Sequence, residues 1–260
     1  MKCSGCSRKL SPGKIRCVHC GLWNHTGGET ETNAVSLADV AASDVDRIVS
    51  GPWDVCFGGG IVRDSAVFLA GEPGAGKSTL LLAVAVAVGQ VTSKKVLYIS
   101  KEETMGAVKA RAIRLKLDTH ALGWITIVSI FKGRLRDLLQ KEKPVLTILD
   151  SLPGLVGVGP GHLDDAVEAL TDLKEYADEC KSPSIIVDQV NKEFDFAGEM
   201  ALQHLVDATI MLKGKEDHPR VLRTRKNRHG PGGATVTFQM TETGLVVPEQ
   251  PTSEEKAKKF

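Results

Sequence analysis

The sequence is short of aromatic residues, of net charge and of long apolar runs, and each shortage excludes a class of protein. Lys and Arg number 33 against 32 Asp and Glu, so polyanion binding must come from local basic patches. The longest apolar run is the nine residues Leu80–Val88, far below the ~20 that a membrane-spanning helix needs. The N-terminal MKCSGCSRKL lacks the apolar stretch of a secretory signal. We therefore expect a soluble, cytoplasmic protein without a membrane partner.

At 260 residues the chain has room for one full-sized domain and a small appendage. Residues 1–28 are rich in Cys, Gly and Ser and too poor in aliphatic residues to build a core unaided. A polar linker is predicted over 29–43, the main domain over 44–247, and a flexible polar tail over 248–260.

The main domain alternates short apolar runs with longer amphipathic segments. Runs rich in Val, Ile and Leu predict buried parallel strands, and the segments between them predict helices on both faces of the sheet. After residue 205, VDATIMLKG, RVLRTRKN and ATVTFQM predict antiparallel strands that extend this sheet, so the fold class is α/β. The predicted strands are Ala66–Ala70, Val96–Ser100, Trp124–Ser129, Val145–Asp150 and Ser184–Asp188, and the predicted helices are Lys77–Gln90, Thr104–Leu117 and Asp164–Glu179.

Residues 71–79, GEPGAGKST, match the phosphate-binding pattern G-x-x-x-x-G-K-[ST] in its required context, after a strand and before a helix. Glycines allow a tight turn whose backbone N–H groups face phosphate oxygens, and the helix adds its positive end. In this pattern Lys77 neutralises the β- and γ-phosphates, and the hydroxyl of Ser78 coordinates Mg²⁺. We predict that nucleotide is bound by Gly71, Glu72, Pro73, Gly74, Ala75, Gly76, Lys77, Ser78 and Thr79.

Carboxylates come at or just after the ends of two other predicted strands. Asp150 ends an apolar run, where a charge is costly unless it binds Mg²⁺ directly or through water; an ordinary turn-capping residue is the alternative. Glu102 and Glu103 follow strand 96–100 at the edge where open α/β sheets bind ligands. We predict Glu102 as the base that activates water and Glu103 as second choice, with one of the two capping the next helix.

Gln189 follows the fifth predicted strand, where it is expected to hydrogen-bond the γ-phosphate; a solvated loop amide is the alternative. The segment after it, Asn191–Met200, is the expected DNA-facing loop. GTP is set aside as the main nucleotide because the N-K-x-D pattern fails at Phe194. The D-x-x-G pattern fails too, because Gly154 comes one position late after Asp150.

Four of the six cysteines lie in the first twenty residues, as two C-x2-C pairs separated by ten residues. Each pair can present two thiolates to one tetrahedral ion, which predicts a zinc ribbon with ligands Cys3, Cys6, Cys17 and Cys20. Disulfides are the alternative, and they are unusual beside an ATPase of intracellular type. The ribbon has no acidic residue up to its last cysteine, so it is either a phosphate-backbone contact or a solvated basic face.

Residues 220–228, RVLRTRKNR, form a second basic cluster without a carboxylate. In a strand, Arg223 and Arg225 share one face, while Lys226 and Arg228 share the other. Two interpretations stay open. The cluster protects an exposed edge strand, or Lys226 and Arg228 reach the ATP of a neighbouring subunit as cationic fingers.

The chain resembles the bacterial RadA (Sms) family, relatives of RecA and of ring helicases. The resemblance runs in order over residues 3–247, through CVHCGLWN, FGGGIV, GEPGAGKSTLLL, VLYISKEE, LQHLVDATIMLKG, RVLRTRKNRHG and FQMTETGL. It implies a RecA-like, Mg²⁺-dependent ATPase that forms a hexameric ring or a helical filament. It also implies loading on single-stranded DNA, branch migration in recombination, and a recombinase or replication protein as partner.

Two departures from the family pattern qualify this expectation. In the family motif K-N-R-F-G, where basic residues couple ATP to DNA movement, His229 replaces the Phe. Family members also continue into a Lon-protease-like domain, and we expect an ATPase core without it. The alternatives are a replicative-type ring helicase and a nucleotide-switch adaptor. Because aromatic residues make up only 5% of the chain, we expect charge to dominate DNA binding, which should therefore fall with salt.

Overall fold

A computed structural model of the chain describes residues 2–3, 5–8, 36–37, 45–129, 133–156, 162–189, 200–215 and 218–248. Contacts within the chain divide it into two compact units, Met1–Asp44 and Val45–Phe260. The second unit holds the sheet and the helices around it. None of the helices in the described ranges is long and apolar enough to cross a bilayer.

The centre of the second unit is a nine-stranded sheet with the order β11-β10-β9-β8-β3-β7-β6-β4-β5. The strands from β8 to β5 pair in parallel, whereas β9, β10 and β11 continue the sheet antiparallel. This confirms the predicted parallel sheet with an antiparallel extension. One detail was wrong, because VDATIMLKG, predicted as the first antiparallel strand, forms β8 and pairs in parallel with β3. The strands are β3 (Ala66–Gly71), β4 (Val96–Ser100), β5 (Ile125–Val128), β6 (Leu146–Asp150), β7 (Ser184–Gln189), β8 (Ala208–Lys213), β9 (Arg220–Asn227), β10 (Thr235–Thr241) and β11 (Gly244–Val246), beside a separate pair, β1 (Arg47–Ile48) and β2 (Ile61–Val62).

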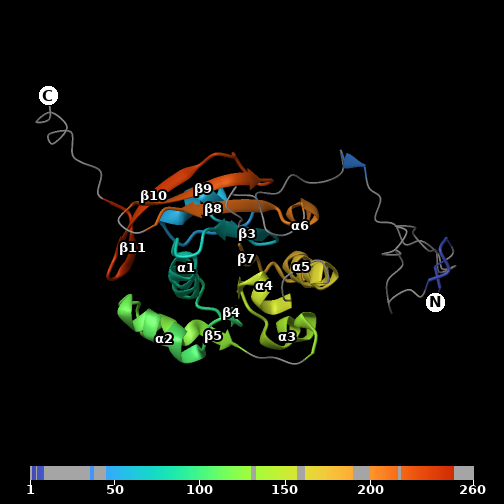
Figure 1. Cartoon of the computed structure of the whole chain (residues 1–260), viewed down its shortest axis with the longest axis horizontal. Helices are drawn as coiled ribbons and strands as arrows, with labels where there is room; N and C mark the ends of the chain where they lie inside the picture. The colour runs from blue at the N-terminus through green and yellow to red at the C-terminus, as the bar shows by residue number, and fades with distance from the viewer. Residues whose placement is uncertain are drawn as a thin grey trace, which may run out of the picture. The chain divides into compact units, whose positions relative to one another are not determined.

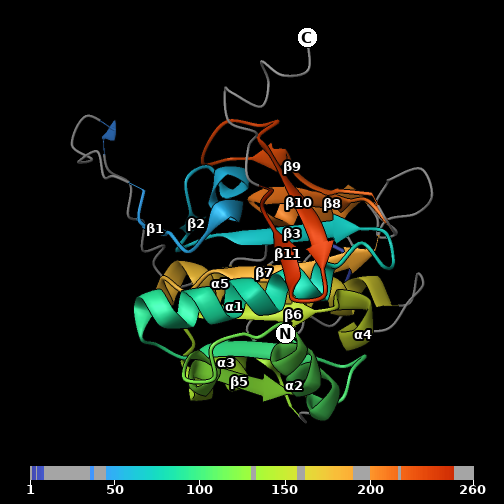
Figure 2. The ribbon, with the colours of Figure 1, turned by 90° about the vertical axis from the view of Figure 1, so that its left-hand side faces the viewer.

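Helices cover both faces of the parallel part of this sheet (Figures 1 and 2). Helix α1 packs on one face with α2 beside it, and α3, α4, α5 and α6 pack on the other. Two 3₁₀ helices complete the set, of which η2 packs on the antiparallel strands. The bounds are η2 Pro52–Phe57, α1 Lys77–Thr92, α2 Met105–Arg114, η3 Ala121–Trp124, α3 Leu135–Glu142, α4 Leu152–Val156, α5 Leu163–Cys180 and α6 Met200–Leu205.

Strand β3 shows why the apolar runs lack a polar face. Its side chains alternate between the two faces of the sheet. Val67 and Leu69 pack in the cluster that contains α1, whereas Ala66 and Phe68 pack in the cluster that contains α5. Both faces are therefore covered by helices, and every residue of the strand is buried.

The parallel strands bring the predicted site residues to one edge of the sheet. Gly71 pairs with Gln189 at the carboxyl ends of β3 and β7. Ser100 pairs with Asp150 at the carboxyl ends of β4 and β6. Because the carboxyl ends of parallel strands meet at a common edge, the loops that follow them surround one cleft.

Candidate functional site

The phosphate-binding turn lies between β3 and α1, as the sequence predicts. Gly76 caps the helix with φ of 101°, in the left-handed region that favours glycine. A Cβ atom there would lie 2.7 Å from the Cε of Met240 on β10, the mobile end of a flexible side chain, so the backbone conformation is the main requirement for glycine. The first turn of α1 has no acidic side chain of its own that would offset the positive end of the helix at the turn.

Lys77 begins α1 and folds back over this turn. Its Nζ donates to the carbonyl of Gly71 at 2.6 Å and to that of Glu72 at 3.0 Å. The ammonium group thus lies inside the loop, where a bound anion would meet it. The carboxylate of Glu72 points to a different partner, because it pairs with Lys215 at 2.8 Å.

The turn forms one wall of a pocket of about 470 Å³. The other walls come from the segment after β4, from the end of β6 and the residue after it, from α2, from β7 and from β10, so six parts of the sequence meet here. The pocket is lined by Pro73, Gly74, Gly76, Lys77, Ser78, Thr79, Glu102, Arg111, Arg114, Asp150, Ser151, Val187 and Met240.

Asp150 is the buried carboxylate of this pocket, with 6% of its surface exposed. The hydroxyl of Tyr98 donates to its Oδ2 at 2.6 Å, and the side chain of Ser78 also hydrogen-bonds it. Burial raises the pKa of Asp150, the two hydrogen bonds lower it, and the charges of Glu103 and Glu102 add to the rise. A hydroxyl and a costly buried carboxylate side by side are the oxygen ligands that Mg²⁺ prefers.

The two predicted bases lie in different surroundings. Glu102 is exposed at the pocket, and its Oε1 accepts a hydrogen bond from the hydroxyl of Ser151. Glu103 is half-buried and forms an ion pair with Arg111 of α2. Neither caps that helix, because Thr104 does so through its Oγ1, which accepts from the backbone N–H of Ala107. The capping alternative is therefore wrong, and Glu102 is the carboxylate that opens onto the pocket.

Gln189 ends β7 with its backbone beside Gly71, the first residue of the phosphate-binding turn. Nothing is described of its side chain, so its contact with a γ-phosphate stays a prediction. The expected DNA-facing segment Asn191–Met200 lies outside the described residues except for its last residue, which begins α6.

Lys226 and Arg228 lie toward the opposite edge of the sheet from the phosphate-binding turn. Lys226 pairs with Thr209 near the amino end of β8, and its Nζ donates to the carbonyls of Gln203 at 2.8 Å and Val206 at 2.7 Å. Burial and the charge of Arg228 lower the pKa of Lys226. Arg228 pairs with the buried Asp207 at 3.4 Å. Neither cation lines the pocket of its own chain.

In strand β9 the side chains alternate between the two faces of the strand as predicted, but only as far as a β-bulge. Arg223 and Arg225 are both exposed, while Leu222 and Thr224 between them are buried. A register shift opposite residues 209 and 210 then interrupts the alternation before Lys226.

The glycine run FGGG, residues 57–60, contacts the loop KNRHG, residues 226–230. Gly58 has φ of 78°, and a Cβ atom there would lie 2.9 Å from the Nδ2 of Asn227. Arg47 joins the two segments, because its guanidinium donates to the carbonyl of His229 at 2.7 Å and to that of Gly60 at 3.4 Å. Two motifs that lie far apart in the sequence thus form one unit.

The predicted zinc ligands are only partly described. Cys3 is buried and Cys6 is half-buried, whereas Cys17 and Cys20 lie outside the described residues. The N–H of Gly5 points to the Sγ of Cys3 at 3.4 Å, and the N–H of Ser7 donates to the carbonyl of Cys3 at 2.9 Å. No cluster of three metal-ligating side chains occurs among the residues that the structure describes.

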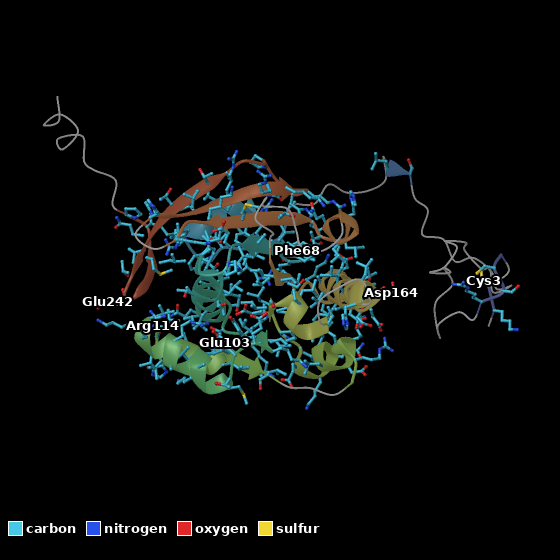
Figure 3. All side chains as sticks on the ribbon, viewed as in Figure 1. Cys3, Phe68, Glu103, Arg114, Asp164 and Glu242 are labelled. Carbon is cyan, nitrogen blue, oxygen red and sulfur yellow. The ribbon has the colours of Figure 1, made fainter. Side chains whose placement is uncertain are left out.

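Six residues of the pocket region were not predicted as site residues: Tyr98, Arg111, Arg114, Ser151, Val187 and Met240. The two arginines had a readable signal, since they lie on the helix after Glu103 and are three residues apart, on one helical face. Arg114 also donates to the carbonyl of Glu242 at 3.4 Å, and Figure 3 labels these two residues side by side. Tyr98 and Met240 look like ordinary strand residues in the sequence.

Comparison with known proteins places this site in context. Residues 52–195 match the family described as AAA domain. The chain is 32% identical over 266 residues to the DNA repair protein RadA of Aquifex aeolicus, covering 95% of this chain and 59% of that protein. It is 31% identical to RadA of Haemophilus influenzae and 30% identical to RadA of Escherichia coli, covering 94% of this chain and 58% of each relative. The chain thus spans less than two thirds of these relatives.

A solved structure supports the fold. The crystal structure of a KaiC-like protein from Pyrococcus horikoshii superimposes with a TM-score of 0.63 at 18% sequence identity. The match covers 79% of this chain and all of the other. This likeness confirms the predicted RecA-like architecture.

Proposed function

Because the chain belongs to the AAA domain family and is RadA-like within it, we propose that it is a Mg²⁺-dependent ATPase of the RecA type that acts on single-stranded DNA. One observation carries the proposal. The phosphate-binding turn, the hydrogen-bonded pair Ser78 and Asp150, and the exposed carboxylate of Glu102 line a single pocket. These are the parts that phosphoryl transfer to water requires.

The residues of the pocket fit distinct roles in hydrolysis. The backbone of residues 71–79 and Lys77 hold the phosphates, and Ser78 with Asp150 would hold Mg²⁺. The metal, when bound, neutralises charge that develops on the phosphate oxygens. Glu102 orients and deprotonates the attacking water, and its hydrogen bond from Ser151 fixes its position. Glu103 is engaged by Arg111, which leaves it less suited to that role.

We further propose that the site is completed by a neighbouring copy of the chain. Lys226 pairs with Thr209, three residues along β8 from Leu212, the partner of Gly71, or roughly 10 Å at the rise of a strand. Arg228 lies farther away, with its backbone N–H bonded to the carbonyl of Asp207. Both cations are thus directed away from the pocket of their own chain. A homo-oligomer, as a ring or a filament, would bring them to the nucleotide of the next subunit as positive charges for the transition state. Gln189, beside Gly71, would contact the γ-phosphate.

Single-stranded DNA is the proposed partner because the relatives are named as DNA repair proteins. The processes proposed for it are recombination and repair, with a recombinase or replication protein as a further partner, and the cytoplasm as its location. Cys3, Cys6, Cys17 and Cys20 are proposed to bind zinc. The turn in which Gly5 points its N–H at the Cys3 sulfur supports this, since such bonds stabilise thiolate ligands.

The decisive experiment measures ATPase activity against protein concentration, with and without single-stranded DNA at low salt. A rise steeper than linear indicates sites completed between subunits, and stimulation by DNA supports the proposed partner. Activity strictly proportional to protein concentration contradicts completion in trans. Nucleotide binding with negligible turnover, unchanged in Glu102→Gln, would favour an adaptor, and unwinding of a forked duplex alone would favour a replicative-type helicase.

A further inference from the structure

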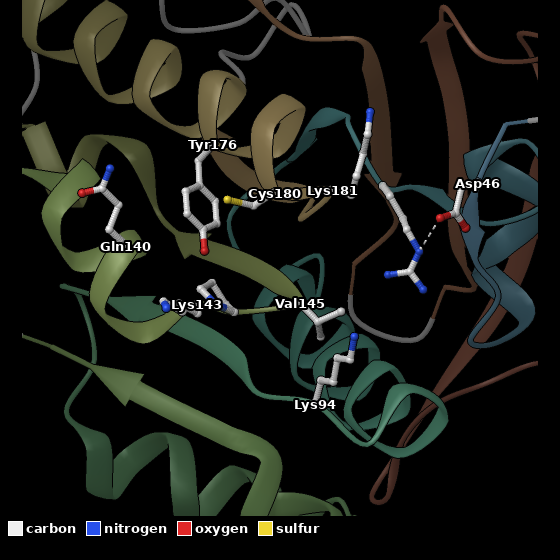
Figure 4. A pocket seen from close by; sticks show the side chains of 10 residues that line it. Asp46, Lys94, Gln140, Lys143, Val145, Tyr176, Cys180 and Lys181 are labelled. Atoms are coloured by element: carbon white, nitrogen blue, oxygen red, sulfur yellow. Dashed lines mark ion pairs between the residues drawn. The ribbon is translucent and has the colours of Figure 1, made fainter. Parts of the chain in front are cut away.

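A second, larger pocket of about 770 Å³ is shown in Figure 4. Its residues Arg63, Lys94 and Val145 precede β3, β4 and β6, so it lies at the opposite edge of the sheet from the phosphate-binding turn. Its walls come from the ends of α1, α3 and α5 and from the segments next to β1, β3 and β6. The pocket is lined by Asp46, Arg63, Lys94, Gln140, Lys143, Pro144, Val145, Tyr176, Cys180 and Lys181. The family pattern and the proposed ATP site leave these residues without a role.

The lining is strongly positive, with four cationic side chains against one carboxylate. Arg63 pairs with that carboxylate, Asp46, at 3.0 Å, and Lys181 pairs with Asp64 outside the pocket at 2.7 Å. Lys94 and Lys143 form no ion pair with any residue in the described part of the chain. Two ammonium groups are thus left to meet an anion, in a protein whose net charge is only +1.

The C-terminal ends of helices offset part of this positive charge but not all of it. The helices α1, α3 and α5 end here with Ser93, Lys143 and Lys181 in left-handed cap conformations. Each helix C-terminus contributes roughly half a negative charge. Three such ends together offset roughly 1.5 of the two positive charges left on Lys94 and Lys143, so the pocket keeps a small positive excess that favours anions.

The shape and chemistry of the lining favour a chain of phosphates over a small ligand. Lysine ammonium groups on flexible stems bind phosphate as point charges without fixing its orientation. Tyr176, the aromatic residue of the lining, is 3% exposed and offers no ring face for a base to stack on. Figure 4 shows its hydroxyl directed toward the turn that carries Lys143. Recognition here would be independent of base sequence.

From these observations we propose that the pocket is a second binding site for the phosphodiester backbone of a single DNA strand, held by Lys94 and Lys143. It rests on the proposed function only in taking nucleic acid as the ligand. Because it lies at the opposite edge from the ATP pocket, both sites can be filled at once. One DNA strand would then bind in this pocket, separately from any DNA strand that binds near the nucleotide.

The test compares two double variants of equal charge by fluorescence anisotropy with a labelled oligothymidylate. K94Q/K143Q removes the two pocket ammonium groups. The control K109Q/K116Q removes two exposed lysines of the α2 region, and Lys116, like Lys143, has a left-handed backbone conformation after a helix. Thermal unfolding of both variants verifies that they fold alike, and ATPase activity without DNA should match the parent in both.

Loss of two phosphate contacts should reduce the slope of log affinity against log salt by about 1.4 and weaken binding roughly 25-fold at 0.1 M salt. The control should bind like the parent. Equal DNA affinity of the two variants overturns the proposal that this pocket binds DNA, and it leaves the ATPase proposal unaffected. Loss of self-association in K94Q/K143Q without loss of DNA binding also overturns it, because the occupant is then a second copy. If K94Q/K143Q loses DNA binding but DNA does not stimulate the ATPase activity of the parent protein, the proposed DNA-binding pocket is supported and the proposed DNA-dependent ATPase function is contradicted.

Discussion

Tyr98 donates its hydroxyl to Oδ2 of Asp150 across 2.6 Å, which joins the interior of β4 to the carboxyl end of β6. Burial raises the pKa of Tyr98 well above its usual range, and the charge of Asp150 and this hydrogen bond raise it further, because ionising the phenol would set two negative charges together. The hydrogen bond from Tyr98 holds the Asp150 side chain in place and lowers its pKa, which opposes the larger rise that burial causes.

Tyr98→Phe should therefore weaken Mg²⁺ binding and ATPase activity together. Loss of a hydrogen bond to a charged group costs about 1.5–3 kcal/mol, or roughly 10- to 100-fold. The pKa of Asp150 should rise further, so the acid limb of the pH–rate profile should move to higher pH. Tyr176→Phe, which removes the hydroxyl of the other tyrosine, should leave Mg²⁺ titrations and pH profiles unchanged. An unshifted acid limb in Tyr98→Phe would contradict this assignment.

Glu102→Gln and Glu103→Gln should separate the two candidate bases. Glu102→Gln should lower kcat by about 10²- to 10⁴-fold with nucleotide affinity retained, since it removes general-base catalysis. Glu103→Gln should instead lower thermal stability and nucleotide affinity, because it leaves the partly buried Arg111 without its ion-pair partner. Single-turnover rates and nucleotide titrations distinguish the two effects. If Glu103→Gln instead lowered kcat and Glu102→Gln lowered stability, Glu103 would be the catalytic base.

Mixing Lys77→Ala with Lys226→Ala should restore activity that neither variant has alone. Each single change should cost about 10³-fold or more if both cations act on the phosphates. In a mixed oligomer, some sites combine an intact phosphate-binding turn with an intact Lys226. Because Lys226 also binds two backbone carbonyls beside α6, thermal unfolding should accompany the assay. Mixtures no more active than their separate components argue for a purely structural role.

Purified protein should contain one zinc ion per chain, measured by elemental analysis. Cys17→Ser and Cys20→Ser should each lose most of this zinc, because a structural site needs all four ligands. Cys180→Ser is the matched control, since that exposed cysteine lies on α5 in the other unit. If the purified protein contains no zinc but still folds and hydrolyses ATP, the proposed zinc ribbon is contradicted.

The parts of the site that could be predicted are those determined by local sequence. The phosphate-binding turn and Asp150 each end or follow a continuous apolar run, so the sheet edge on which they meet follows from strand direction alone. Strand 96–100 was predicted at its observed bounds, and the other predicted parallel strands differ by a residue at their ends. Helix α3, LRDLLQKE, was not predicted; it is short and mostly polar, and burial of Leu135 and Leu139 against α5 stabilises it.

The contacts that could not be predicted depend on register and on helix orientation. The bond from Tyr98 to Asp150 exists because β4 pairs with β6 so that Ser100 lies opposite Asp150. Arg111 enters the pocket because α2 packs through Val108 and Ala112 against the region of Leu82. Neither relation has a local signature in one sequence. The contact between residues 57–60 and 226–230 likewise became visible only in three dimensions.

That contact has a mechanical consequence. Arg47, at the entrance to the second unit, is bonded directly to the carbonyl of His229, one residue beyond Arg228. Tension applied to the chain ahead of Arg47 would therefore act on the loop that follows β9, next to the two cations that we propose to act in trans. Displacement of Arg47 would thus change the position of Arg228, the proposed contact to the nucleotide of a neighbouring subunit.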